Sequence, residues 1–301
     1  MTAALSGVLE FAPPLVLAAL GGVLSERAGV VNIGLEGMMR AGAFAAAVGA
    51  FFTGSPWLGL ACGAAAGIAA AAVHAALSLR FRADQVVSGI AINLVMLGLT
   101  SFLLEATFGS SGVTPPVPAL PRDSAGRTAL AWIALALPLL LHFGFSRTAT
   151  GLRIRAVGEN PHAAATSGVR VLPLRAACVL GSGALAGLGG AALSVGILGQ
   201  FDVRMPAGQG FMALAAMVFG RWTPLGAAGA AFFFAGADAL QRQLSFSLHA
   251  ADLRLSGVFL ALPYALTLLV LAVGAGRIRA PAADGIAYDP EDPTTTPESR
   301  T

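Results

Sequence analysis

The segment from Arg147 to Arg175 reads RTATGLRIRAVGENPHAAATSGVRVLPLR and separates two long apolar stretches. It carries five arginines and a single acid, Glu159, so we expect it to lie in water. Within it, Asn160 can cap the first turn of a helix, Pro161 suits the first helical position, and Gly168 can end the helix in the left-handed conformation. The segment therefore predicts a short exposed helix between two membrane spans, which would suit docking of a soluble partner.

The composition around this segment is that of a membrane protein. The chain has 301 residues, of which 56% are hydrophobic and only 11% are charged. A soluble domain of this length needs more charge to cover its surface. Several apolar stretches have about the 20 residues that cross a hydrocarbon core of about 30 Å. We therefore expect an all-α, polytopic transmembrane helix bundle with about eight to ten spans, some broken or re-entrant. The expected spans are 8–24, 29–52, 57–79, 86–108, 128–146, 172–199, 224–241 and 254–275, with a shorter apolar piece at 208–220.

The residue types exclude several classes of function. All eighteen basic residues are arginine, so the chain lacks a phosphate-binding loop with its lysine, and ATP would have to be used by a partner. Cys62 and Cys178 both lie in apolar stretches, and without a cysteine cluster neither a disulfide framework nor a metal site is predicted. No catalytic residue set or nucleic-acid-binding patch is evident. We expect a transport subunit that is not an enzyme, binds no cofactor itself and has no nucleic-acid partner.

Arginines in the short loops orient the chain in the membrane. Arg80 and Arg82 lie in one loop, and the arginines of 147–175 lie in another loop two spans further along. Both loops are therefore predicted to be cytoplasmic. Arg277 and Arg279 place the end of the last predicted span on the same side.

Two glycine-rich segments interrupt the apolar pattern. They are SERAGVVNIGLEGMMRAGA, from Ser25 to Ala43, and PAGQGFMALAAMVFGRWTPLGA, from Pro206 to Ala227. Each has a glycine-rich break, a methionine-bearing apolar run and then an arginine. Transporters often carry internal repeats whose broken helices meet near the bilayer centre, where irregular backbone must be buried or line a wet cavity. The pattern indicates such a repeat; the alternative is chance similarity in a chain rich in glycine and alanine.

Polar side chains inside apolar segments are the candidates for a substrate pathway, because such groups usually line a pathway or pair with one another. We hypothesise that four of them approach a common cavity, where a polar substrate needs a few groups to orient it. They are Asn32, Glu36, Asn93 and Gln209. Two alternatives remain. Glu36 and Arg40, four residues apart, suit a structural ion pair, and Asn93 suits a hydrogen bond between helices, the role favoured for it.

Glycines four residues apart predict where helices approach closely. Gly63 with Gly67 and Gly183 with Gly187 form two such pairs. Small residues at this spacing let helix backbones come together inside a membrane.

Three phrases together resemble the permease subunits of ABC importers. They are SERAGVVNIGLEGMM, DQVVSGIAINLVMLGLTSF and GQGFMALAAMVFGRWTPLGA, and the resemblance covers about residues 5 to 275. The most similar branch transports nucleosides and simple sugars and is related to the ribose and branched-chain amino-acid permeases. The alternatives are import of simple sugars or branched-chain amino acids, or, in a different class, an ion-coupled secondary transporter, which also uses inverted repeats and broken helices.

The resemblance also implies partners and a location. It implies a multi-pass protein of the bacterial cytoplasmic (inner) membrane, in contact with the lipid bilayer and with cytosolic ATPase subunits that use the ATP. It further implies a second permease subunit, in a heterodimer rather than a homodimer, and a substrate-binding protein outside.

Such permeases carry a cytoplasmic coupling loop similar to E-A-A-x-x-x-G. After Asn160 and Pro161, the matching positions here read His162, Ala163, Ala164, Ala165, Thr166, Ser167 and Gly168. His162 stands where the glutamate is expected, so this chain has no carboxylate at that position. The expected domains are a permease domain at 1–279, with its coupling loop at 147–175, and a disordered cytoplasmic tail at 280–301, rich in Pro, Thr, Asp and Glu.

Overall fold

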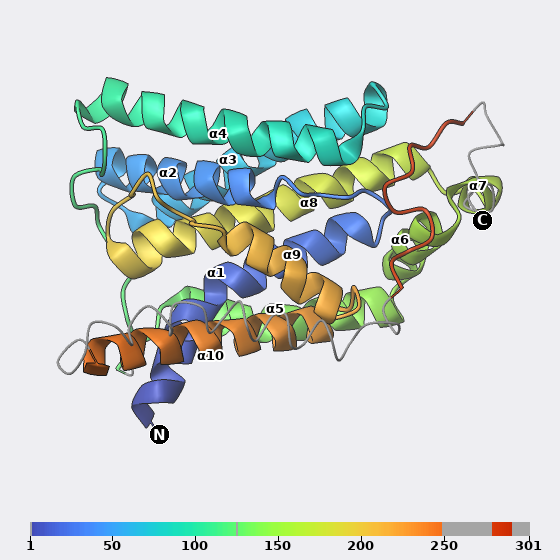
Figure 1. The fold of residues 1–301 in the computed structure, drawn as a ribbon. Helices are drawn as coiled ribbons and strands as arrows, with labels where there is room; N and C mark the ends of the chain where they lie inside the picture. Colours follow the sequence, from blue (N-terminus) through green and yellow to red (C-terminus); the bar gives the residue numbers. More distant parts are fainter. Residues whose placement is uncertain (1, 125, 249–278, 291–301) are drawn as a thin grey trace.

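The computed structural model describes residues 2–124, 126–248 and 279–290, and almost all regular structure in them is helical (Figure 1). Two isolated β-bridges are the other regular pairings in these residues. The prediction of an all-α bundle is confirmed. In chain order the helices are α1 (Thr2–Glu26), α2 (Leu35–Thr53), α3 (Pro56–Ala75, extended by a π-helical stretch at Ala76–Arg80), α4 (Gln85–Phe108), α5 (Ala129–Arg147), α6 (Ala149–Glu159), α7 (Pro161–Thr166), α8 (Val171–Ala191, extended by a π-helical stretch at Ala192–Leu198), α9 (Gln209–Phe219) and α10 (Pro224–Leu248).

Six helical segments in the described residues are long and apolar enough to cross a membrane. They are α1 to α5 and α8, with the π-helical extensions of α3 and α8 included. The short apolar piece expected at 208–220 is α9, whose 11 residues extend only about 17 Å at about 1.5 Å per residue. The span expected at 254–275 lies outside the described residues, so the total of about eight to ten spans remains a prediction.

The span expected at 29–52 is helical only from Leu35, where α2 begins. The residues before it continue the chain without forming a helix. Gly34 lies against α4 at Gly89, where a Cβ on Gly89 would be 2.8 Å from the Gly34 nitrogen. Gly34 and Gly89 therefore allow the non-helical segment before α2 to contact the backbone of α4 directly. The interruption matches the break predicted from the glycine-rich segment.

The centre of the bundle depends on the glycine pairs of α3 and α8. A Cβ on Gly67 would lie 2.1 Å from the carbonyl oxygen of Gly183, and a Cβ on Gly187 would lie 2.4 Å from that of Gly63. Real Cβ atoms do not approach carbonyl oxygens this closely, so the two backbones are in direct contact. The predicted close packing at these four glycines is confirmed.

The two arginine-bearing loops lie at the same end of the bundle. Residues 279–290, named here the C-terminal segment, run across that end beside α6, α7 and α8 (Figure 1). Asp289 forms an ion pair with Arg82 (Nη2–Oδ1 2.8 Å), and the amide of Ala282 donates to Glu159 Oε2 (3.3 Å). One short segment thus touches both loops, in agreement with the prediction that the two loops lie on the same side of the membrane. Composition predicts disorder from residue 280, whereas the structure packs the tail against the bundle as far as 290.

Alanine at Gly67 should destabilise the protein, because its Cβ would collide with the Gly183 carbonyl and push α3 from α8. Overpacking of this kind costs about 1–3 kcal/mol. The matched control is Gly98→Ala in α4, where an added Cβ meets nothing within 4 Å and helix propensity favours alanine by about 0.5–1 kcal/mol. Thermal unfolding in detergent should show a lower Tm for Gly67→Ala alone. An equal Tm in the two variants would contradict the tight contact.

Candidate functional site

The two glycine-rich breaks meet at the side chain of Glu36, in the first turn of α2. Its Oε1 accepts a hydrogen bond from the amide of Gly208 (2.9 Å), and its Oε2 accepts one from the amide of Gly210 (2.8 Å). The first amides of a helix have no partner within it, and the N-terminus favours negative charge. Glu36 therefore caps α9 from another helix. Gly210 is required there, since a Cβ would lie 2.5 Å from the Glu36 Cα.

The loop before α9 is fixed by a second side chain of α2. Arg40 donates to the carbonyl oxygen of Val203 rather than to Glu36, with which it forms no direct ion pair in the described residues. On the other side of the loop, the amide of Phe201 donates to Thr114 Oγ1 (2.9 Å). In place of the expected ion pair, Glu36 makes two hydrogen bonds to the start of α9 and Arg40 makes one to the loop before it.

Asn93 and Asn32 support the break before α2. Asn93 Oδ1 accepts from the amide of Gly37 (2.7 Å), and its Nδ2 donates to the carbonyl of Ile33 (3.0 Å). Asn93 therefore joins α4 to both sides of the break, as expected for an interhelical hydrogen-bonding residue. Asn32 is fully buried and donates from Nδ2 to Ser182 Oγ in α8 (2.9 Å). Its Oδ1 has no hydrogen-bond partner among the described residues.

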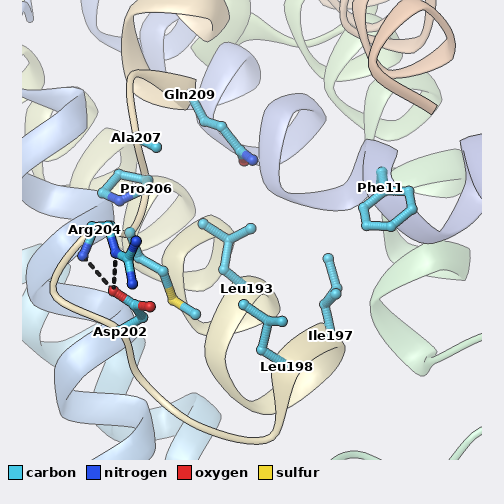
Figure 2. A pocket seen from close by; sticks show the side chains of 10 residues that line it. Phe11, Leu193, Ile197, Leu198, Asp202, Arg204, Pro206, Ala207 and Gln209 are labelled. Carbon is cyan, nitrogen blue, oxygen red and sulfur yellow. Dashed lines mark hydrogen bonds and ion pairs between the residues drawn. The ribbon is translucent and has the colours of Figure 1, made fainter. Parts of the chain in front are cut away.

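A cavity of about 330 Å³ opens beside the start of α9. Figure 2 shows Gln209 of α9 and Phe11 of α1 on opposite sides, with Leu193 and Ile197 of the α8 extension between them. At the rim, Asp202 pairs with Arg204 (Oδ1–Nε 3.4 Å). The walls are mainly apolar with a few polar groups, as in sites that bind small molecules. Gln209 lines this cavity, and its Oε1 is buried and has no hydrogen-bond partner among the described residues.

The four pathway candidates have different positions relative to this cavity. Gln209 lines it, and Glu36 lies beside it, holding the amides on either side of Gln209. Asn32 and Asn93 instead bond to α8 and to the chain before α2. The structure therefore brings Glu36 and Gln209 together, while the two asparagines lie in the support behind them.

The helix predicted between Asn160 and Gly168 is present as α7. Asn160 Oδ1 accepts from the amide of Ala163 (3.0 Å), Pro161 is the first helical residue, and Gly168 has φ +85°. The preceding helix α6 was not predicted. Its signal is Thr148, whose Oγ1 accepts from the amide of Gly151 (3.1 Å) as an N-cap.

The two faces of α7 differ in exposure. Ala164 is only 4% exposed and packs with Val157, Val171 and Tyr288. Ala163, by contrast, is exposed and lies beside a groove of about 490 Å³ between α6 and α7. A partner that docks on α7 therefore meets the Ala163 face.

Sequence reasoning did not predict the buried contacts of three residues at this end, which are Arg175, Glu26 and Trp222. Arg175, counted with the loop arginines, is fully buried in α8 and donates from Nε to the Ala28 carbonyl (2.9 Å). Glu26 accepts a hydrogen bond from Trp222 Nε1 (2.6 Å), almost 200 positions further along the chain. The signal that could have indicated the burial of Arg175 is its position within an apolar run.

No cluster of three or more possible metal ligands occurs in the described ranges.

Replacing Glu36 by Gln should weaken the start of α9, because the amide NH₂ faces one of the two backbone N–H groups that the carboxylate accepts from. Hydrogen bonds to charged groups contribute about 1.5–3 kcal/mol. The control is Glu105→Gln, which makes the same change at an exposed position of α4. Thermal unfolding should show a lower Tm for Glu36→Gln only; matching Tm values would exclude the capping role.

The chain is similar to known transport proteins along almost its whole length. Residues 4–271 match the family described as branched-chain amino acid transport system / permease component. The chain is 41% identical to the guanosine ABC transporter permease protein NupQ of Bacillus subtilis, over 93% of this chain and 94% of NupQ. It is 36% identical to the nucleoside ABC transporter permease protein NupC of Lactococcus lactis, over 94% and 95% of the two chains.

A more distant relative comes from the same bacterium as NupQ. The guanosine ABC transporter permease protein NupP of Bacillus subtilis is 28% identical, over 74% of this chain and 69% of NupP. These matches confirm the resemblance noted in the sequence. Because the family match and the relatives NupQ and NupC each cover most of the chain, this protein belongs to the permease-component family of the branched-chain amino acid transport systems and is a multi-pass membrane permease of the ABC-transporter type.

Proposed function

We propose that this chain is the permease subunit of an ATP-driven importer of nucleosides in the bacterial cytoplasmic membrane. The observation that carries the proposal is the pairing of its whole-length similarity to NupQ and NupC, named as guanosine and nucleoside permeases, with the exposed, capped helix α7. The chain has no lysine for a phosphate-binding loop, so ATP is hydrolysed by cytosolic partner subunits. Helix α7 is the part of this chain that binds those subunits.

The substrate pathway in this proposal includes the cavity at Gln209. The cavity and α7 lie at opposite ends of α8, which with its extension has 28 residues. A nucleoside carries an apolar base face and several hydroxyl groups. Phe11 offers a ring for the base, and the side-chain amide of Gln209, which lines the same cavity, is the group to bond a hydroxyl. The broken helices beside the pathway are held in place by the side chains of Asn32, Glu36 and Asn93.

The assembly proposed around the chain contains a second, different permease subunit, two ATPase subunits and an extracytoplasmic substrate-binding protein. NupQ and NupP are two different guanosine permeases of one bacterium, and both are similar to this chain, which supports a heterodimer. Large apolar side chains are exposed along α4 and α5, among them Leu94, Phe102 and Leu140. Lipid and a second permease are the surroundings that cover such side chains.

The function is tested with the complete transporter in proteoliposomes that lack a membrane potential and a pH gradient. Labelled guanosine should be taken up when ATP reaches the ATPase and not when ADP replaces it. Ribose and leucine in excess should not compete. Uptake that needs an imposed ion gradient and no ATP would show a secondary transporter instead, and competition by ribose or leucine would reassign the substrate class.

Glutamate at Ala163 should block docking of the ATPase, because it places a charge on the exposed face of α7. We expect ATPase co-purification and guanosine uptake to fall about tenfold or more, which corresponds to about 1.4 kcal/mol of docking free energy. The control Ala119→Glu adds the same charge at an exposed alanine outside the α6–α7 region and should retain the ATPase. Ala164 is unsuitable for this test, since its side chain is buried behind α7. Normal co-purification with Ala163→Glu would exclude α7 as the docking helix.

A further inference from the structure

The C-terminal segment packs against the buried side of the helix that is proposed to receive the ATPase. Its Tyr288 is 9% exposed and lies in an apolar cluster with Val157 and Ala164. The Tyr288 ring also lies 5.0 Å from the His162 ring, measured between centroids. The amide of Ala283, earlier in the segment, donates to the carbonyl of Gly158 in the last turn of α6 (2.9 Å). Tyr288 therefore touches α7 from the side opposite the exposed Ala163 face.

The same segment is bonded to the ends of two spans through Arg175. This buried guanidinium donates from Nη1 to the Ile286 carbonyl (3.0 Å) and from Nε to the Ala28 carbonyl (2.9 Å). The turn after α1 fits closely around it, since a Cβ on Gly29 would lie 2.5 Å from Arg175 Nη2. One side chain of α8 thus joins the C-terminal segment to the turn that follows α1.

The end of α1 extends this connection to α9. Glu26, the last residue of α1, lies near Asp284 of the C-terminal segment. Burial and the nearby Glu26 raise the pKa of Asp284, although Arg175 opposes the change. Glu26 in turn accepts from Trp222 Nε1, three residues beyond the end of α9. The first residue of α9 is Gln209, which lines the cavity.

These contacts form a continuous connection between the two proposed working parts of the permease. We propose that the C-terminal segment relays movement of α7 to α9 and the cavity, with Tyr288 as the positioning residue against α7. The contacts run from α7 through Tyr288 and the C-terminal segment to Arg175, which bonds to the turn after α1. At the end of α1, Glu26 continues them to Trp222 and α9. This inference rests on the proposed function, since it assumes that α7 moves with the ATPase.

A segment that only anchors the tail would affect the amount of folded protein. A relay affects how much substrate is moved for each ATP hydrolysed. The ratio of guanosine taken up to ATP hydrolysed separates the two roles, because loss of folded complex lowers both quantities together. The ion pair between Arg82 and Asp289 offers a second, independent way to disturb the segment.

The experiment measures this ratio in proteoliposomes that hold the complete transporter. Tyr288→Ala should lower it at least about fivefold, within the range of coupling between sites, while the ATPase stays bound. Tyr288→Phe keeps the packed ring and should retain the wild-type ratio. Arg82→Asp and Asp289→Arg should each lower the ratio, and the double variant, which restores an ion pair in the opposite sense, should recover it.

The outcomes are distinct. Wild-type ratios in Tyr288→Ala and in both single charge variants would overturn the relay, as would a double charge variant no better than the single ones. If Tyr288→Ala does not fold, the charge variants decide alone. If the wild-type transporter shows no ATP-driven guanosine uptake, the proposed function fails, and the relay fails with it.

Discussion

The arrangement of this permease depends on one constraint: backbone amides inside a membrane need partners from the protein. The carboxylate of Glu36 meets this need for α9, because it accepts from the amides of Gly208 and Gly210 at a helix start that has no partners of its own. Asn93 does the same for the break before α2. Each interruption of a helix is thus stabilised by a side chain from another helix, which allows irregular backbone next to a cavity.

Glycine determines how closely the helices around this junction approach. The contacts of Gly67 with Gly183 and of Gly187 with Gly63 leave no room for a Cβ between α3 and α8. Lipid gives no hydrophobic drive for helix association, so close backbone packing supplies much of the stability. Helix α2 packs on the centre formed by α3 and α8 and also contacts α9, while α6 and α7 contact α8 directly.

The end of the bundle that carries α7 combines exposed and buried arginines. The arginines of the loops predict the orientation of the chain in the membrane, whereas Arg175 is buried and bonds to the C-terminal segment and to the turn after α1. The acid pair of Glu26 and Asp284 lies in the same region, linked to Trp222. Glu26 and Arg175 bond to segments distant in sequence, although Arg175 Nη2 and Asp284 Oδ1 have no hydrogen-bond partner among the described residues. Contacts between distant segments therefore connect this end of the molecule.

The sequence by itself determined the all-α membrane class, the break before α2 and the capped helix α7, because these follow from hydropathy, glycine and local capping residues. It also identified Glu36 and Asn93 as polar groups that need partners. Which partners they have was decided by tertiary structure, since Glu36 bonds to amides more than 170 positions away. Contacts between distant segments likewise decide that Ala164 and Arg175 are buried and that Tyr288 packs against α7. No local sequence pattern encodes these contacts.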